Sequence, residues 1–170
     1  MIILTGGAGM IGSMVAWHLN TILNEDKFVI IDEIYNKEQE KNISKRKFID
    51  YVEKKDFHKF LKNADKVSAV IHMGAISATT ETNFNNLLNY NIRFSQMLWH
   101  FCAKKKVPFI YASSAATYGD GENGYTDSES KLGQLSPLNP YGYSKHFFDR
   151  WIQNEIETKQ QIPPQWCGLK

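Results

Sequence analysis

The stretch MIILTGGAGMIG, residues 1–12, decides the fold of this chain. Its apolar first part, Met1–Thr5, is typical of a short strand that is buried on both faces of a sheet. Glycines at positions 6, 9 and 12 then allow a tight turn, close approach of the backbone to a pyrophosphate, and close packing of a following helix. The pattern therefore predicts a strand, loop and helix that bind a dinucleotide.

The next segments favour the same interpretation over an ordinary tight turn. A helix is expected over about Met10–Leu23, with its N-terminal amides directed at the phosphates. A second apolar run, Phe28–Ile31, ends in Asp32. A carboxylate at this distance from the glycines is placed to bind the ribose hydroxyls of adenosine.

Strand-like and helix-like segments alternate along the rest of the chain. Further strands are expected near Phe48–Tyr51, at Val67–His72, at Pro108–Ala112 and at Gln165–Lys170, and further helices over about Lys54–Asn63, Asn83–Lys105 and Tyr141–Thr158. Residues 35–47 form a charged segment to which no element is assigned. Residues 119–139 are rich in Gly, Ser, Asn and Pro, show no clear period, and are expected to form a loop near the site. This alternation predicts an α/β fold with a doubly wound parallel sheet of Rossmann type.

Composition narrows the class of protein. A chain of 170 residues with 42% hydrophobic content can bury a core, and it is interpreted as one domain, residues 1–170. A net charge of +2 and the lack of long apolar runs give no argument for nucleic acid or membrane as a partner. Two cysteines, Cys102 and Cys167, favour a reducing cytoplasm over a disulfide framework. The five histidines lack metal-ligand spacing, so no metal site is expected.

Tyr141 and Lys145 are the candidate catalytic pair. A spacing of four places both side chains on one face of a helix, one turn apart. A positive charge beside a phenol favours the phenolate, which can take a proton from an alcohol while a hydride leaves its carbon. Ser114, at the end of the strand ending in Ala112, can bond the same substrate oxygen. Taken alone, the pair also fits a packed aromatic and a solvated lysine, and the dinucleotide loop decides between these interpretations.

Two other segments are candidate cofactor contacts. The loop Met73–Ser77 follows an expected strand, and its small residues would let a cofactor approach the backbone; a plain connecting turn fits equally well. The basic run Lys41–Lys47 could meet the 2′-phosphate of NADP, although such a run is more often a solvated face.

Several of these motifs together resemble the extended short-chain dehydrogenase/reductase superfamily. They are TGGAGMIG at residues 5–12, the strand end at Ser114, and the pair Tyr141 and Lys145. Within it, GAISATTE at residues 74–81, YASSAATYG at 111–119 and PLNPYGYSK at 137–145, followed by Phe148 and Asp149, are similar to the ADP-glyceromanno-heptose 6-epimerases. The resemblance covers essentially the whole chain.

This resemblance implies a function and a set of site residues. The family interconverts the two 6-epimers of ADP-glycero-manno-heptose for the lipopolysaccharide inner core, by transient oxidation at C6 with tightly bound NADP. Tyr141 would be the base, Lys145 would hold the nicotinamide ribose, and Ser114 would bind and orient the substrate oxygen. The implied cofactor contacts are Gly6, Gly9, Met10, Ile11, Gly12, Asp32, Glu33, Lys54, Met73, Gly74, Ala75, Ile76, Ser77, Asn91 and Lys145. The full-length protein is expected to be a cytoplasmic homo-oligomer that binds an ADP-heptose sugar nucleotide.

The sequence departs from the family pattern in two places. Gln39 replaces a lysine that would serve the 2′-phosphate, and Asp32 and Glu33 add negative charge, so NAD is the alternative to NADP. Family members also continue well beyond Lys170. The C-terminal substrate part is therefore expected to be missing, and the chain is expected to be an inactive fragment.

Two alternative functions stay open on the sequence. A UDP-hexose 4-epimerase or a sugar-nucleotide dehydratase would use the same tyrosine and lysine, although dehydratases carry an acidic residue after the serine pair, where this chain has Ala115–Thr117. A non-catalytic dinucleotide-binding module would keep the fold without turnover.

Overall fold

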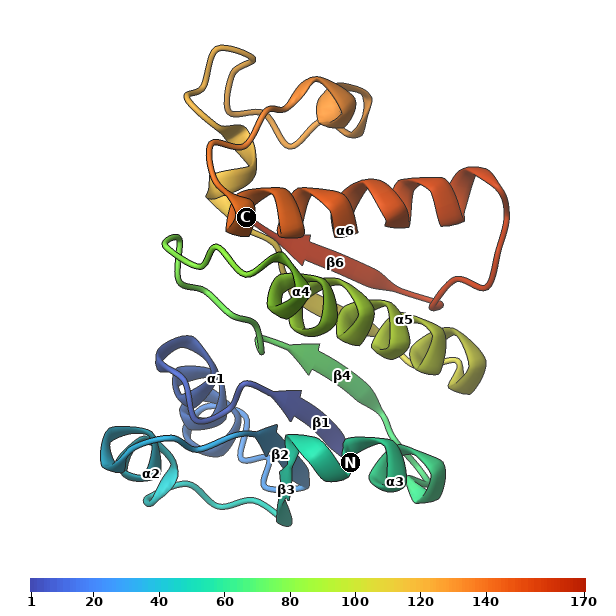
Figure 1. The fold of residues 1–170 in the computed structure, drawn as a ribbon. Coiled ribbons are helices and arrows are strands. Elements are labelled where there is room, and N and C mark those ends of the chain that lie inside the picture. Colours follow the sequence, from blue (N-terminus) through green and yellow to red (C-terminus); the bar gives the residue numbers. More distant parts are fainter. The chain divides into compact units, whose positions relative to one another are not determined.

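The computed structural model describes all residues from 1 to 170, and strands and helices alternate along the chain (Figure 1). The strands are β1 (Ile2–Thr5), β2 (Phe28–Asp32), β3 (Asp50–Glu53), β4 (Ala69–His72), β5 (Phe109–Ala112) and β6 (Trp166–Leu169). The α-helices are α1 (Met10–Thr21), α2 (Lys37–Ile43), α3 (Phe57–Asn63), α4 (Phe84–Leu87), α5 (Phe94–Lys105) and α6 (Pro140–Glu157). The strand order is β3-β2-β1-β4-β5-β6, with β1 parallel to both β2 and β4. The predicted α/β fold with a parallel Rossmann-type sheet is confirmed.

The chain divides into two compact units, and the boundary passes through β5. Unit 1 comprises residues 1–74 and 107–110, and unit 2 comprises residues 75–106 and 111–170. Each unit carries its own part of the candidate site.

Unit 1 is built around the two apolar runs recognised in the sequence. Leu4, Phe28 and Ile30 are fully buried and pack with residues of α1 and with Ile43 of α2. The parallel registers place Thr5, the last residue of β1, opposite Ile31 of β2 and His72 of β4. Three strands therefore end at the same edge, and the loops that follow them lie together there.

Unit 2 has an aromatic core. Trp99 of α5 is fully buried and meets the edges of Trp151 on α6 and Trp166 on β6, with ring centroids 6.1 and 5.6 Å apart. The Trp99 indole N–H donates to the Gln161 carbonyl at 3.1 Å, so the buried polar group is satisfied. These contacts fix α6, which carries the candidate catalytic pair, on α5. None of the helices in either unit combines the length and the hydropathy that a membrane crossing requires.

One element was missed in the sequence. The charged segment 35–47 contains α2, which begins where the Asn36 side chain accepts a hydrogen bond from the Gln39 N–H at 3.0 Å. Only Ile43 of this helix is buried, so the segment lacks the apolar period on which the prediction relied. The capping asparagine followed by Glu38 and Glu40 was the available signal.

Other boundaries differ from the predictions by one turn or less. The third strand is shifted two residues beyond the predicted 48–51. The predicted helix 54–63 begins as a 3-10 turn, Lys54–Asp56, and the predicted helix 83–105 contains a π-helical segment, Leu88–Arg93. Short 3-10 helices lie at Ala115–Tyr118 and Glu129–Gln134, the latter inside the predicted loop. Each change depends on local hydrogen bonding, which apolar periodicity does not report.

Candidate functional site

The glycine loop of unit 1 has no room for a Cβ at Gly6 or at Gly12. Gly6 has a φ of +71°, and a Cβ on it would lie 2.5 Å from the Gly74 nitrogen. A Cβ on Gly12 would overlap the Gly6 carbonyl oxygen and lie 2.7 Å from the carbonyl carbon. The loop is closed by bonds from the Gly6 N–H to the Ile31 carbonyl and from the Gly9 N–H to the Gly6 carbonyl, at 2.9 and 3.1 Å. Glycine is therefore required here by backbone packing, as the sequence predicted.

The first turn of α1 is open to a ligand. Gly9 precedes the helix, and no side chain caps its N-terminal amides. Met10 is 78% exposed and Ile11 is 58% exposed, although both are large apolar residues. Uncapped amides and the positive end of the helix dipole suit a phosphate, and the two exposed side chains are available to pack on a cofactor.

Asp32 ends β2 beside the glycine loop. One carboxylate oxygen accepts the Ala8 N–H at 2.8 Å, and the other accepts the Glu33 N–H, also at 2.8 Å. The Asn42 side chain of α2 donates to the Ala8 carbonyl at 2.9 Å, so both backbone groups of Ala8 are bonded. Each carboxylate oxygen keeps a lone pair for a ribose hydroxyl. Asn42 is a positioning residue that the sequence reasoning did not identify.

Lys54 is the cation of this region. It begins the 3-10 turn after β3, and burial lowers its pKa while the nearby carboxylates of Glu33 and Asp32 act in the opposite direction. Gln39 is occupied differently, because its side-chain oxygen accepts the Tyr35 N–H at 2.7 Å. The positive charge of Lys54 therefore lies within electrostatic reach of both Glu33 and Asp32.

The end of β1 is bonded to the end of β4. Thr5 Oγ1 lies 2.6 Å from His72 Nδ1, and the Gly74 N–H donates to the same hydroxyl at 3.2 Å. Both Thr5 and His72 are buried. They fix the start of the Met73–Ser77 loop against the glycine loop, a role that no sequence pattern in this chain indicated.

Asn91 fixes the remainder of that loop within unit 2. Its side-chain oxygen accepts the Ile76 N–H at 2.8 Å, and its amide donates to the Ile76 carbonyl at 3.0 Å and to Ser144 Oγ at 2.9 Å. Asn91 is 1% exposed and lies in the π-helical segment. It was predicted as a cofactor contact, but both of its N–H groups are bonded to protein. In the structure it connects the Ala75–Ser77 part of the loop to α6.

The catalytic candidates lie on α6 and after β5, all in unit 2. Asn139 caps α6 by accepting the Gly142 N–H at 2.8 Å, which sets the start of the helix one residue before Tyr141. Tyr141 and Lys145 share α6 with the predicted spacing. Ser114 caps the next 3-10 turn, accepting the Ala116 N–H at 3.1 Å, and its hydroxyl proton stays available to donate.

Lys145 is the most strongly perturbed cation of the site. Its side chain is 4% exposed, and its ammonium donates to the Ala112 carbonyl at 2.8 Å. Burial lowers its pKa to about 8, while the negative charge of Asp149 acts in the opposite direction. A buried lysine of this kind belongs more often to a functional site than to a solvated face.

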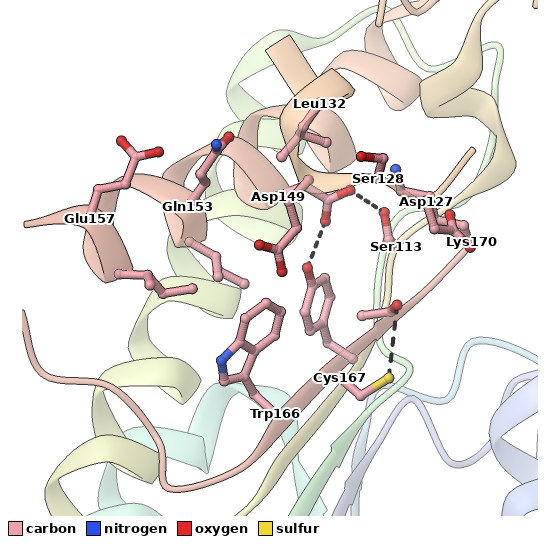
Figure 2. A pocket seen from close by; sticks show the side chains of 15 residues that line it. Ser113, Asp127, Ser128, Leu132, Asp149, Gln153, Glu157, Trp166, Cys167 and Lys170 are labelled. Carbon is pink, nitrogen blue, oxygen red and sulfur yellow. Dashed lines mark hydrogen bonds between the residues drawn. The ribbon is translucent and has the colours of Figure 1, made fainter. Parts of the chain in front are cut away.

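A cavity of about 420 Å³ opens beside α6 and β6 in unit 2 (Figure 2). Its walls combine apolar side chains such as Ile152 and Trp166 with polar groups that include Ser113, Asp149 and Lys170. The sequence did not predict it, because its walls come from segments that are far apart in the chain. No group of three or more His, Cys, Asp or Glu side chains is arranged to hold a metal ion.

The predicted site residues fall into two sets. Gly6, Gly9, Met10, Ile11, Gly12, Asp32, Glu33, Lys54, Met73 and Gly74 belong to unit 1, and Ala75, Ile76, Ser77, Asn91, Ser114, Tyr141 and Lys145 belong to unit 2. The first set holds most of the predicted cofactor contacts, including the glycine loop, and the second holds all three predicted catalytic residues.

Comparison with known proteins identifies the family of the chain. Residues 2–164 match the model of the NAD dependent epimerase/dehydratase family. The whole chain is 50% identical to an ADP-L-glycero-D-manno-heptose-6-epimerase of Fusobacterium nucleatum, and 91% of it is 46% identical to the enzyme of that name from Nitratidesulfovibrio vulgaris. The alignments cover 51% and 49% of those proteins, so the chain spans about half the length of the curated relatives it matches.

Solved structures of epimerases share the fold of this chain. The ADP-L-glycero-D-manno-heptose-6-epimerase of Helicobacter pylori superimposes with a TM-score of 0.76 at 27% identity, over 91% of this chain and 50% of that one. The UDP-glucuronic acid 4-epimerase of Bacillus cereus in complex with NAD superimposes with a TM-score of 0.78 at 23% identity, which establishes the shared fold. That match covers 99% of this chain and 55% of the other.

Proposed function

Because the chain belongs to the NAD dependent epimerase/dehydratase family, we propose that it carries the cofactor loop and the acid–base residues of an ADP-L-glycero-D-manno-heptose 6-epimerase. The observation that supports this most is the buried Lys145 ammonium, bonded to the Ala112 carbonyl on the helix that carries Tyr141. The 50% identity to the enzyme of Fusobacterium nucleatum supports the choice of substrate.

The residues of unit 1 fit a nicotinamide dinucleotide. Gly6 and Gly12 leave the backbone bare where any Cβ would collide, and the first turn of α1 has free amides. Asp32 would accept the ribose hydroxyls. When bound, the cofactor would supply a hydride acceptor and donor at C6 of the heptose.

The residues of unit 2 would transfer the proton of the C6 hydroxyl. Tyr141 would remove it from the C6 hydroxyl as the hydride leaves. Once the carbonyl has presented its other face, a second acid–base group in the remaining part of the full-length enzyme would return a proton to the oxygen. The Ser114 hydroxyl would donate to the same oxygen and hold it in position. Lys145, still protonated at pH 7 with a pKa of about 8, would favour the phenolate and bind the nicotinamide ribose.

NADP is the proposed cofactor, with NAD as the alternative. Lys54 would bind the 2′-phosphate, whereas Asp32 and Glu33 would repel it. Titration of the purified chain with each dinucleotide by calorimetry decides between them. A tenfold preference for NAD would overturn the choice of NADP. The substrate would be an ADP-heptose sugar nucleotide, and the full-length enzyme would be a cytoplasmic homo-oligomer.

The decisive test of activity uses a chimaera, since the chain spans about half of its relatives. This chain is joined to the remaining part of the Fusobacterium nucleatum enzyme and is incubated with the ADP-heptose. We expect epimerisation at C6, followed by NMR, without net consumption of cofactor. Tyr141→Phe should lower turnover by a factor of about 10² to 10⁴ and leave dinucleotide binding unchanged.

The matched control is Tyr143→Phe, because Tyr143 lies on the same helix but is 50% exposed. It should leave turnover unchanged. Near-normal turnover of Tyr141→Phe would show that the base lies elsewhere. Conversion of UDP-glucose with no action on the heptose would replace the proposal with a 4-epimerase. Dinucleotide binding without turnover of either sugar would favour a non-catalytic module.

A further inference from the structure

Asp149 has no role in the chemistry described above, but it is bonded to the catalytic region at two points. It lies on α6, one turn after Lys145, and is 6% exposed. Its carboxylate accepts the Tyr111 hydroxyl at 2.8 Å and the Ser113 hydroxyl at 2.5 Å (Figure 2). Tyr111 belongs to β5 and Ser113 follows that strand. One side chain of α6 thus binds two alternate residues of a neighbouring segment.

Lys145 binds the residue between them. Its ammonium donates to the carbonyl of Ala112 at 2.8 Å. Residues 111, 112 and 113 are therefore all held by two side chains one turn apart on α6, and Ser114 follows directly. A displacement of α6 along β5 would break all three bonds. The same bonds consequently hold Tyr141, one turn before Lys145, in a fixed relation to the segment that ends in Ser114.

Lys145 and Asp149 also carry opposite charges, one turn apart on α6. Lys145 is buried, and a buried ammonium without an opposite charge is costly. The carboxylate that acts on it is that of Asp149. Burial raises the pKa of the Asp149 carboxyl, while its two hydroxyl donors oppose that rise and suit an ionised carboxylate, which only accepts hydrogen bonds. Lys170 also faces Asp149 from the chain end beyond β6, and Asp127, Glu129 and Glu157 line the same cavity.

We propose that Asp149 is a positioning residue for the catalytic pair: it fixes α6 on β5 and supplies the negative charge that keeps Lys145 protonated. The inference deepens the proposed function and depends on it for the roles of Tyr141 and Lys145. Asp149 itself touches no reacting atom. It acts through Lys145 by charge and through Tyr111 and Ser113 by hydrogen bonding.

The test follows the titration of Lys145 in the chain as it exists, without any substrate. Lysines are labelled with ¹³C at Cε and ¹⁵N at Nζ, and the Lys145 signal is assigned by its loss in Lys145→Arg. Asp149→Asn keeps the size and one acceptor oxygen but removes the charge. We expect its Lys145 proton dissociation constant to rise about tenfold, because an opposite charge at short range favours the ammonium.

Two variants separate charge from general damage to the fold. Asp127→Asn removes another carboxylate of the same cavity, one bonded to Tyr118, and should leave Lys145 unchanged. Asp149→Glu keeps the charge and should hold the Lys145 dissociation constant within about threefold of the unsubstituted value. This variant carries the test if Asp149→Asn does not fold, as judged by tryptophan fluorescence and near-UV dichroism.

Each outcome bears on the inference. It is supported if Asp149→Asn raises the Lys145 proton dissociation constant while Asp149→Glu and Asp127→Asn leave it within about threefold. It is overturned if Lys145 titrates identically in folded Asp149→Asn, or if Asp149→Glu shifts it as far as the loss of the charge would. A failure of the chimaera to epimerise the heptose would remove the proposed function but would not alter these titrations.

Discussion

The candidate site residues of the two units differ in what they offer to a ligand. In unit 1 the glycine loop and the uncapped first turn of α1 offer backbone N–H groups, and Gly6 and Gly12 have no room for a Cβ. In unit 2 the candidates are the side chains of Tyr141, Lys145 and Ser114, and neighbouring residues are bonded by Asn91 (to Ser144), Asp149 (to Ser113) and Asn139 (to Gly142). Phosphate recognition requires only donors at close range, whereas moving a proton requires a group that titrates. Substitutions in the two units should therefore change different measured properties of the protein.

The largest effect is expected at Gly12. A Cβ there would overlap the Gly6 carbonyl, and the three nearest atoms all belong to the backbone of Gly6 and Gly7, so no flexible side chain can move aside. Gly12→Ala should lower the free energy of unfolding by about 3 kcal/mol or more and abolish dinucleotide binding. Urea unfolding and calorimetry measure the two effects.

The controls separate folding from binding. A Cβ on Gly133 would have no atom within 4 Å, so Gly133→Ala should change neither the free energy of unfolding nor dinucleotide binding. Gly9→Val should lose binding with a much smaller cost in stability, because the nearest atom to a Cβ on Gly9 is the Gly6 carbonyl oxygen at 3.3 Å. A Gly12→Ala protein that binds either dinucleotide normally would contradict this interpretation of the glycine loop.

The second effect is a pH dependence of the free energy of unfolding, and it arises from Lys145 in unit 2. Burial lowers the pKa of Lys145 from 10.5 to about 8, so between these values the unfolded chain binds the proton that the folded chain has lost. Stability should therefore rise with pH across this interval, by about 3 kcal/mol in total. Lys145→Met should lack this contribution, and unfolding in urea from pH 7.5 to 10 shows the difference. Parallel pH profiles for the two proteins would contradict a buried, perturbed lysine.

The third effect concerns the three side-chain hydrogen bonds by which Asn91 binds Ile76 and Ser144. Asn91→Ala removes three side-chain hydrogen bonds at a fully buried position and leaves the Ile76 backbone groups unpaired. We expect a loss of about 2–3 kcal/mol in the free energy of unfolding and faster amide exchange at Ile76. Asn89→Ala is the matched control, since Asn89 lies two residues away, is exposed, and accepts only from Arg93. Equal stability of the two variants would show that the hydrogen bonds of Asn91 contribute nothing to the free energy of unfolding.

The smallest effect concerns the choice of dinucleotide. Lys54→Ala should weaken NADP binding by about tenfold, or 1.4 kcal/mol, and leave NAD binding within about twofold. The neighbouring Lys55 is exposed and provides the control, Lys55→Ala, which should change neither affinity. Calorimetry with both cofactors checks this. An equal loss for NAD and NADP in Lys54→Ala would show that Lys54 does not bind the 2′-phosphate.

The sequence was most informative where a function depends on local spacing. The glycines of residues 6–12 and the interval from Tyr141 to Lys145 were correctly placed on a loop and on a helix, because both patterns span only a turn or two of chain. It was least informative where polar residues had no period, and α2 was missed for this reason. That helix supplies Asn42, which bonds the carbonyl of Ala8.

By itself, the sequence determined the strand–loop–helix unit and the alternation of elements, and it supplied the candidate acid–base groups, since these follow from residue type and short-range geometry. Only the tertiary structure decided what holds them in place. The bonds of Thr5 to His72, of Asn91 to Ile76 and of Asp149 to Ser113 join residues 67, 15 and 36 positions apart. Such pairs form when packing brings distant segments together, and no local pattern encodes the partner of a buried polar group.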